Sequence, residues 1–158
     1  QLIWLPACPS TNSVAQQLQR ENRASEGCTV ITGHQTAGRG QRGNQWEAAA
    51  NENLTLSVVW HPTFLAATEQ FLLSQAVALA ALDWARRWLG ASGDNTLRAF
   101  GVATATSLSL LTGRQYDLAE AAARLLECLE ARYLQLRAGR TGQLRQDYLA
   151  ALYRYQQP

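Results

Sequence analysis

Hydrophobic and polar positions follow two different periods along the chain, and each period predicts a different kind of element. Residues 2–5 and residues 28–32 form short apolar or β-branched runs of strand length. In residues 54–60 the two-residue period of a strand places large apolar side chains on one face, namely Leu54, Leu56, Val58 and Trp60. We therefore expect at least three strands.

Apolar residues at helical spacing predict four helices. The first follows the hydroxyl and amide side chains of residues 10–13, which are good helix caps, and continues to about Arg23. The second covers residues 67–89 and ends at Gly90, the third begins at the capping pair Asp117 and Glu120 and stops at Gly139, and the last covers residues 144–155.

The order of these elements predicts an α/β fold of the α+β type, with a mixed sheet covered by helices. Residues 34–46 have little apolar content and three glycines, so we expect a loop there. Residues 91–100 offer no apolar run of strand length, which leaves the expected sheet short of strands.

Composition narrows the class of protein. A chain of 158 residues with 47% apolar and 16% charged residues is typical of one globular domain. No apolar run approaches the length of a membrane helix, and no signal peptide is visible. A net charge of +2 is too small to indicate nucleic-acid or anionic-membrane binding. Three dispersed cysteines fit neither a disulfide framework nor a zinc site, and they favour a reducing cytoplasm.

The segment from Gly38 to Trp46 carries the most informative chemistry. Its glycines allow the backbone N–H groups to approach a ligand, and Arg39 and Arg42 carry charge suited to phosphate or carboxylate. No acidic residue lies between Gly27 and Trp46, so these arginines have no local partner. An anion site is one interpretation, and an exposed loop or an RNA-binding arginine segment is another.

Other kinds of site receive less support from the sequence. The glycines match the dinucleotide-binding spacing, but no helix pattern follows them, and the P-loop motif is absent. His34 and His61 lack a second ligand at metal spacing, which predicts surface or loop roles and no metal site. Ser10 and Thr11 have no nearby histidine that could act as a base.

The chain resembles the catalytic domain of biotin protein ligases. The resemblance rests on the order and spacing of Ser10-Thr11-Asn12, of the run from Gln35 to Gly43 with Trp46, and of Asn53-Leu54 leading into Ser57. It continues at residues 105–108 and through the C-terminal helices, so it covers most of the chain.

The resemblance implies that biotin is activated by ATP with Mg²⁺ and transferred to a lysine of a biotin carboxyl carrier protein, a subunit of acetyl-CoA carboxylase. It implies that Ser10, Thr11, Asn12 and Gln35 line the biotin pocket. It also implies that a loop closes over biotin and the adenylate, with Arg39 and Arg42 as the catalytic residues; the loop residues are Gly38, Arg39, Gln41, Arg42, Gly43 and Trp46. A homodimer is an assembly that the resemblance allows. We expect no repressor role and no DNA partner from this chain, because it shows no helix-turn-helix ahead of Leu2.

Two departures from the family pattern stand out. Gln41 occupies a position where many members carry arginine, which leaves one charge fewer near the adenylate. The family's Lys-Trp-Pro-Asn-Asp motif and its C-terminal barrel domain are absent from the printed chain. We therefore expect residues to be missing near 94–95 and near 99–100, so that residues 1–158 form an incomplete catalytic domain.

Three alternatives remain open. A lipoate ligase or octanoyltransferase would share the architecture but is not expected to carry the glycine-arginine loop. A non-catalytic anion- or RNA-binding module would bind through Arg39 and Arg42, with an affinity that falls steeply with salt. A degenerate, inactive ligase is expected if the central segment is truly lacking.

Overall fold

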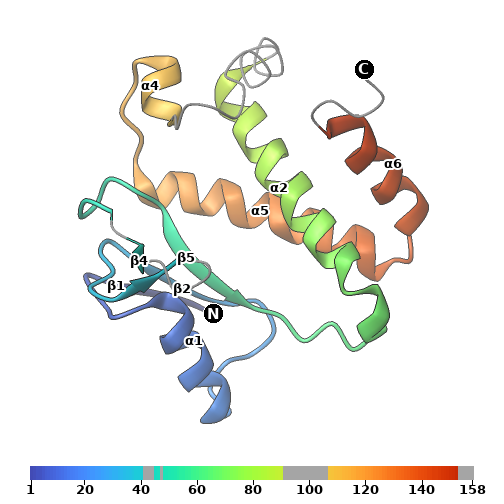
Figure 1. The fold of residues 1–158 in the computed structure, drawn as a ribbon, viewed down its shortest axis with the longest axis horizontal. Helices are drawn as coiled ribbons and strands as arrows, with labels where there is room; N and C mark the ends of the chain where they lie inside the picture. Colours follow the sequence, from blue (N-terminus) through green and yellow to red (C-terminus); the bar gives the residue numbers. More distant parts are fainter. Residues whose placement is uncertain (41–44, 47, 91–106, 153–158) are drawn as a thin grey trace. The chain divides into compact units, whose positions relative to one another are not determined.

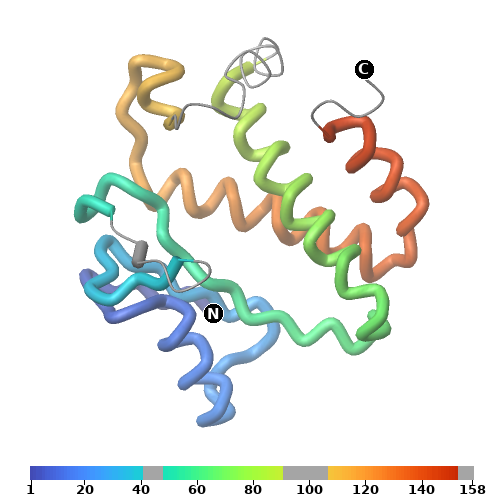
Figure 2. Tube along the Cα trace, viewed as in Figure 1, coloured from blue at the N-terminus to red at the C-terminus, as the bar shows by residue number. Residues whose placement is uncertain are grey.

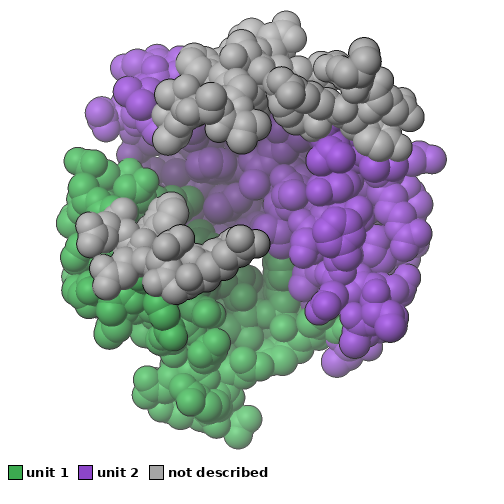
Figure 3. Space-filling model, in the orientation of Figure 1, with its two compact units in different colours: residues 1–62 green, residues 63–158 purple. Residues whose placement is uncertain are grey.

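The computed structural model describes residues 1–40, 45–46, 48–90 and 107–152. The chain divides into two compact units, residues 1–62 and residues 63–158 (Figures 1 and 3). The prediction of an α+β fold with a mixed sheet is confirmed. None of the helices in the described residues is long and apolar enough to cross a membrane.

The first unit is built on a three-stranded sheet in the order β1-β2-β5. Strand β1 (Leu2–Leu5) runs parallel to β2 (Cys28–Thr32), and β5 (Thr55–Val59) runs antiparallel to β2. The chain passes from β1 through α1 (Thr11–Arg20) before it enters β2, as parallel strands require a crossover (Figure 2). Because β2 is the central strand, all five of its residues are buried.

One face of this sheet packs against α1. Ala15 and Leu18 of the helix form a buried cluster with Val30 of β2 and Val59 of β5, together with Cys28. Residues at even positions of β5 occupy the other face and are only partly buried. The two-residue period thus predicted correctly which residues of β5 share a face. Helix α1 covers the face that carries Ser57 and Val59, and not the face with the apolar residues at even positions.

Several predicted boundaries need correction in this unit. Helix α1 ends at Arg20, three residues before the expected end, and β5 is two residues shorter than the expected strand. The expected loop contains a short hairpin, in which β3 (Gly38–Arg39) pairs with β4 (Gln45–Trp46). A strand of two residues is too short to show a hydrophobic period, so no local pattern indicated these strands.

The second unit is helical. Helix α2 (Phe71–Leu89) follows a 3₁₀ turn at Ala67–Glu69, and it packs against α5 (Leu118–Arg137) and α6 (Thr141–Ala151). One buried cluster joins these helices and contains Leu72, Ala76, Leu79, Leu136 and Leu144. A short helix, α4 (Leu108–Thr112), had not been predicted from the sequence.

The predicted ends of the long helices are largely confirmed. Asp117 caps α5 by accepting a hydrogen bond from the backbone N–H of Glu120, 2.8 Å away. Gly90 and Gly139 both have positive φ just beyond a helix, where glycine is favoured because it has no Cβ. The last helix begins at Thr141 instead of residue 144, and the helix expected over 67–89 is regular only from Phe71.

Some predictions concern residues that lie outside the described part of the chain. The positions where we expect missing residues, near 94–95 and near 99–100, fall within 91–106. The end of the last predicted helix falls within 153–158. These predictions stay predictions, as does the assignment of residues 1–158 to one catalytic domain.

A charged cluster links the three long helices of the second unit. The Arg132 Nε of α5 donates to Asp83 of α2 at 2.7 Å, and its Nη1 donates to Asp147 of α6 at 2.8 Å. The hydrogen bond from Arg132, with a further one from Gln143, holds the pKa of Asp147 below its usual value. Arg132 is largely buried, so its charge is better shielded from water than that of an ordinary surface arginine.

We expect Arg132→Leu to lower the free energy of unfolding by about 1 to 2 kcal/mol, because it leaves two carboxylates without their shared partner. Denaturant unfolding measures this. Arg145→Leu is the matched control, since Arg145 is exposed and lies 3.8 Å from Glu69. The pKa of Asp147 is lowered in the folded state, so its contribution is present at neutral pH and is lost as the pH falls through that pKa. Equal stability of the two variants at neutral pH would contradict the prediction.

Candidate functional site

The segment after β2 is held against the loop between β1 and α1. The backbone N–H of Cys8 donates to the His34 carbonyl at 3.1 Å, and the N–H of Thr36 donates back to Cys8 at 3.0 Å. Ala37 continues the pattern with a hydrogen bond to the Pro9 carbonyl. This short parallel bridge determines where the side chain of the intervening residue, Gln35, can lie.

Gly33 allows the close approach that starts this segment. Its N–H donates to the Leu5 carbonyl, and its own carbonyl accepts from the N–H of Asn51 at 2.8 Å. A Cβ at this position would overlap the side-chain amide of Asn51. A larger residue here would force the Asn51 side chain to move and would crowd the Pro6 carbonyl at 3.3 Å, so the constraint comes from space and not from a positive φ.

Gln35 places its carbonyl oxygen at the N-terminus of α1. Oε1 of Gln35 accepts from the Thr11 backbone N–H at 2.8 Å and from the Thr11 hydroxyl at 3.2 Å. The first N–H groups of a helix have no partner within the helix, so Gln35 satisfies one of them from 24 residues away. Ser10 holds the N-cap position, but its side chain makes no capping hydrogen bond, which corrects the sequence-based expectation.

Ser57 extends this polar cluster from the sheet. Its hydroxyl lies 2.9 Å from the Thr11 hydroxyl, and it projects from β5 on the face that α1 covers. Ser57 belongs to the pattern that resembles the family, but it was not predicted as a site residue. A hydroxyl between the apolar residues Leu56 and Val58 was a weak signal for it, which Thr55 in the same strand shares.

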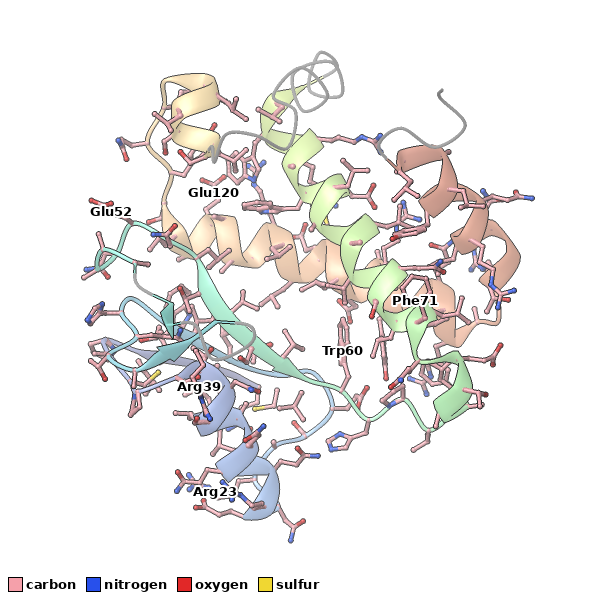
Figure 4. All side chains as sticks on the ribbon, in the orientation of Figure 1. Arg23, Arg39, Glu52, Trp60, Phe71 and Glu120 are labelled. Atoms are coloured by element: carbon pink, nitrogen blue, oxygen red, sulfur yellow. The ribbon has the colours of Figure 1, made fainter. Side chains whose placement is uncertain are left out.

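Arg39 comes from the hairpin strand β3 and lies beside α1 (Figure 4). Its guanidinium donates to the hydroxyl of Ser13, one turn along the helix from Ser10. Within the described ranges no carboxylate forms an ion pair with Arg39. An exposed guanidinium held by a neutral hydroxyl keeps most of its donors available for an anionic ligand.

The structure brings together only part of the predicted site. Ser10 and Thr11 are buried, with 6% and 3% of their surface exposed, and Gln35 is half-buried beside them. Asn12 is exposed on α1. The remaining predicted residues belong to the hairpin: the backbones of Gly38 and Trp46 pair with each other, while Gln41, Arg42 and Gly43 lie outside the described residues.

An open pocket of about 570 Å³ adjoins Gln35. The described residues that line it are His34, Gln35, Thr36, Ala48 and Ala49. The Nδ1 of His34 is buried without a hydrogen-bond partner in the described part of the chain. His61, the other histidine, bonds through its backbone N–H to Glu26 at 2.7 Å, as expected for a surface role.

The described residues contain no group of three histidine, cysteine or acidic side chains that could together hold a metal ion. What they provide near Arg39 is a set of neutral hydrogen-bonding groups with one cation. Such a set is suited to a ligand that has a polar, uncharged group at one end and an anionic group nearby.

The described residues thus combine a mixed sheet, a crossover helix with a polar cluster at its N-terminus and a hairpin that carries Arg39. The chain belongs to the biotin/lipoate A/B protein ligase family, whose model matches residues 4–100, more than half of its length. Members of this family are ligases or transferases that act on a lysine of an acceptor protein. No curated protein matches the chain significantly.

We expect Thr11→Val to lower the free energy of unfolding by about 1 to 2 kcal/mol. The substitution keeps the side-chain volume but removes the hydroxyl shared by Gln35 and Ser57, which leaves partly buried polar atoms unpaired. Thr55→Val is the matched control, because Thr55 lies two residues from Ser57 in the same strand, with no side-chain hydrogen bond in the described part of the chain. Denaturant unfolding measures both variants. An equal effect of the two substitutions would show that the polar cluster does not contribute to the free energy of unfolding.

Proposed function

We propose that the protein is a biotin protein ligase, which forms biotinyl-5′-AMP from biotin and ATP and transfers biotin to a lysine of a biotin carboxyl carrier protein. The observation that carries the proposal is the polar cluster of Thr11, Gln35 and Ser57, together with Arg39, which bonds Ser13 in the first turn of the same helix. The family match supports the reaction class and leaves both biotin and lipoate as substrates.

The polarity of the cluster favours biotin over lipoate. The biotin head group is a cyclic urea with one carbonyl acceptor and two N–H donors, whereas the dithiolane ring of lipoate offers no comparable groups. Thr11 already bonds Gln35 and Ser57, whereas the Nε2 group of half-buried Gln35 has no partner among the described residues, so an apolar head group in contact with it would leave this donor unpaired. A site that bonds polar groups of its substrate rejects an analogue that lacks them more strongly than an apolar pocket can.

Arg39 is suited to the reacting end of biotin. In the first step the biotin carboxylate attacks the α-phosphorus of ATP, an acyl phosphate bond forms, and pyrophosphate leaves. Negative charge gathers on the phosphate oxygens, where a guanidinium and backbone N–H groups stabilise it. Arg42 and Gln41 follow Arg39 in the chain and are assigned to the same loop by the family resemblance.

In the second step the Nζ of the acceptor lysine attacks the acyl carbon of biotinyl-5′-AMP. The amide bond forms, AMP leaves, and the lysine loses a proton. The acceptor is a carrier domain of acetyl-CoA carboxylase in this proposal. Mg²⁺ bound to the ATP phosphates would shield their charge during the first step.

We expect Arg39→Ala to slow biotin-dependent adenylate formation at least tenfold, because the loss of one charge-assisted hydrogen bond costs about 1.5 to 3 kcal/mol. The measurement is biotin-dependent exchange of pyrophosphate into ATP by the full-length protein. Arg23→Ala is the control, since Arg23 is an exposed arginine that pairs with Glu21.

The same assay separates the alternative functions. Exchange supported by lipoate and not by biotin would identify a lipoate ligase and overturn the choice of substrate. Binding of RNA that weakens steeply with salt, without any response to biotin, would instead support an anion-binding module.

A further inference from the structure

We propose that Ser57 is a positioning residue that acts through Thr11 to orient the side-chain amide of Gln35, so that the Gln35 Nε2–H group donates to the carbonyl oxygen of a neutral cyclic urea. The inference rests on the proposed function and deepens it, because it identifies a residue that determines head-group selectivity. Three residues from three separate elements carry the argument.

The orientation of the Gln35 amide follows from the chemistry of its partner. The backbone N–H of Thr11 can only donate, so the atom 2.8 Å from it must be the acceptor of the amide, Oε1. The Nε2 group therefore points away from Thr11. It has no hydrogen-bond partner in the described part of the chain, although Gln35 lines the open pocket.

The direction of the hydroxyl protons follows in turn. Thr11 has a single hydroxyl proton, and the bond to Gln35 Oε1 uses it. The contact of 2.9 Å between the Thr11 and Ser57 hydroxyls must then be donated by Ser57. All three groups are thus aligned in one direction, from Ser57 through Thr11 to Gln35, and each bond polarises the next.

The link between Thr11 and Gln35 is the weaker one, with 3.2 Å between the two oxygens. A donor from behind strengthens it, because an oxygen that accepts a hydrogen bond becomes a better donor through its own proton. Without Ser57, the Thr11 hydroxyl no longer accepts the hydrogen bond that favours its orientation toward Gln35. The amide then keeps only the backbone N–H of Thr11 as an anchor.

The position of Ser57 is well suited to this role. Ser57 lies in the middle of β5, where Val30 of the central strand is its ladder partner. Its backbone is therefore fixed by the sheet, while Thr11 is fixed by the first turn of α1. The hydroxyl of Ser57 reaches Thr11 across the interface between helix and sheet, from 46 residues away in the sequence.

The alignment has a consequence for ligand selectivity. An oriented Nε2–H group donates to a carbonyl oxygen and repels a group that carries only donors. Biotin presents a urea oxygen, whereas 2-iminobiotin at neutral pH presents a protonated guanidinium in its place. A fixed amide distinguishes the two, but an amide that can rotate presents its oxygen to the guanidinium and loses the distinction.

The test compares the dissociation constants of biotin and 2-iminobiotin at neutral pH, by calorimetry on the full-length protein. We expect Ser57→Ala to reduce the preference for biotin by about fivefold, the effect of one neutral hydrogen bond. Ser57→Thr retains the hydroxyl and is expected to retain the preference. Thr55→Val changes a neighbouring residue of the same strand and is expected to leave both constants unchanged.

Each other outcome is decisive. If Ser57→Ala weakens both ligands equally, Ser57 has only a structural role and the inference is wrong, while the proposed function stands. If the unmodified protein binds neither ligand, the proposed function fails, and the inference fails with it. Should Ser57→Ala not fold, as judged by circular dichroism, Ser57→Cys supplies a weaker donor, and an unchanged preference in that variant overturns the inference.

Discussion

The arrangement of the candidate site depends on the single acceptor that Gln35 offers to the N-terminus of α1. The first N–H groups of a helix need partners, and a buried one without a partner is costly. Ser10 stands where a cap is expected but does not bond its own helix. Gln35, from the segment after β2, accepts the hydrogen bond from the Thr11 N–H instead. The same contact therefore satisfies the end of the helix and positions the site residue.

This constraint explains why the sheet and the site are inseparable. Gln35 reaches Thr11 only because the Cys8 backbone pairs with the segment after β2. Gly33 permits that pairing, since any side chain there would displace Asn51. The parallel pairing of β1 with β2 brings the two segments side by side, and α1 is the crossover that parallel strands require. A change in the register of β1 would therefore move the ligand-binding groups.

The two units use charge in different ways. In the helical unit, Arg132 is enclosed by Asp83 and Asp147, and its charge serves to join helices. In the first unit, Arg39 is exposed and bonded to a neutral hydroxyl. An arginine whose charge is already neutralised contributes to stability, whereas one without a carboxylate partner among the described residues retains its attraction for an anion. The contrast supports a ligand role for Arg39 on physical grounds that do not depend on the family.

The sequence by itself determined the three strands of the main sheet, the long helices and the residue types of the glycine-arginine segment, because hydrophobic period, caps and residue type are local properties. Asp117 and Gly139 mark the ends of α5 as their types predict. The tertiary structure alone decided which face of β5 meets α1, and with it the role of Ser57. It also replaced the expected Ser10 cap with Gln35. Both outcomes depend on contacts between residues 24 and 46 positions apart, and no local pattern records such distances.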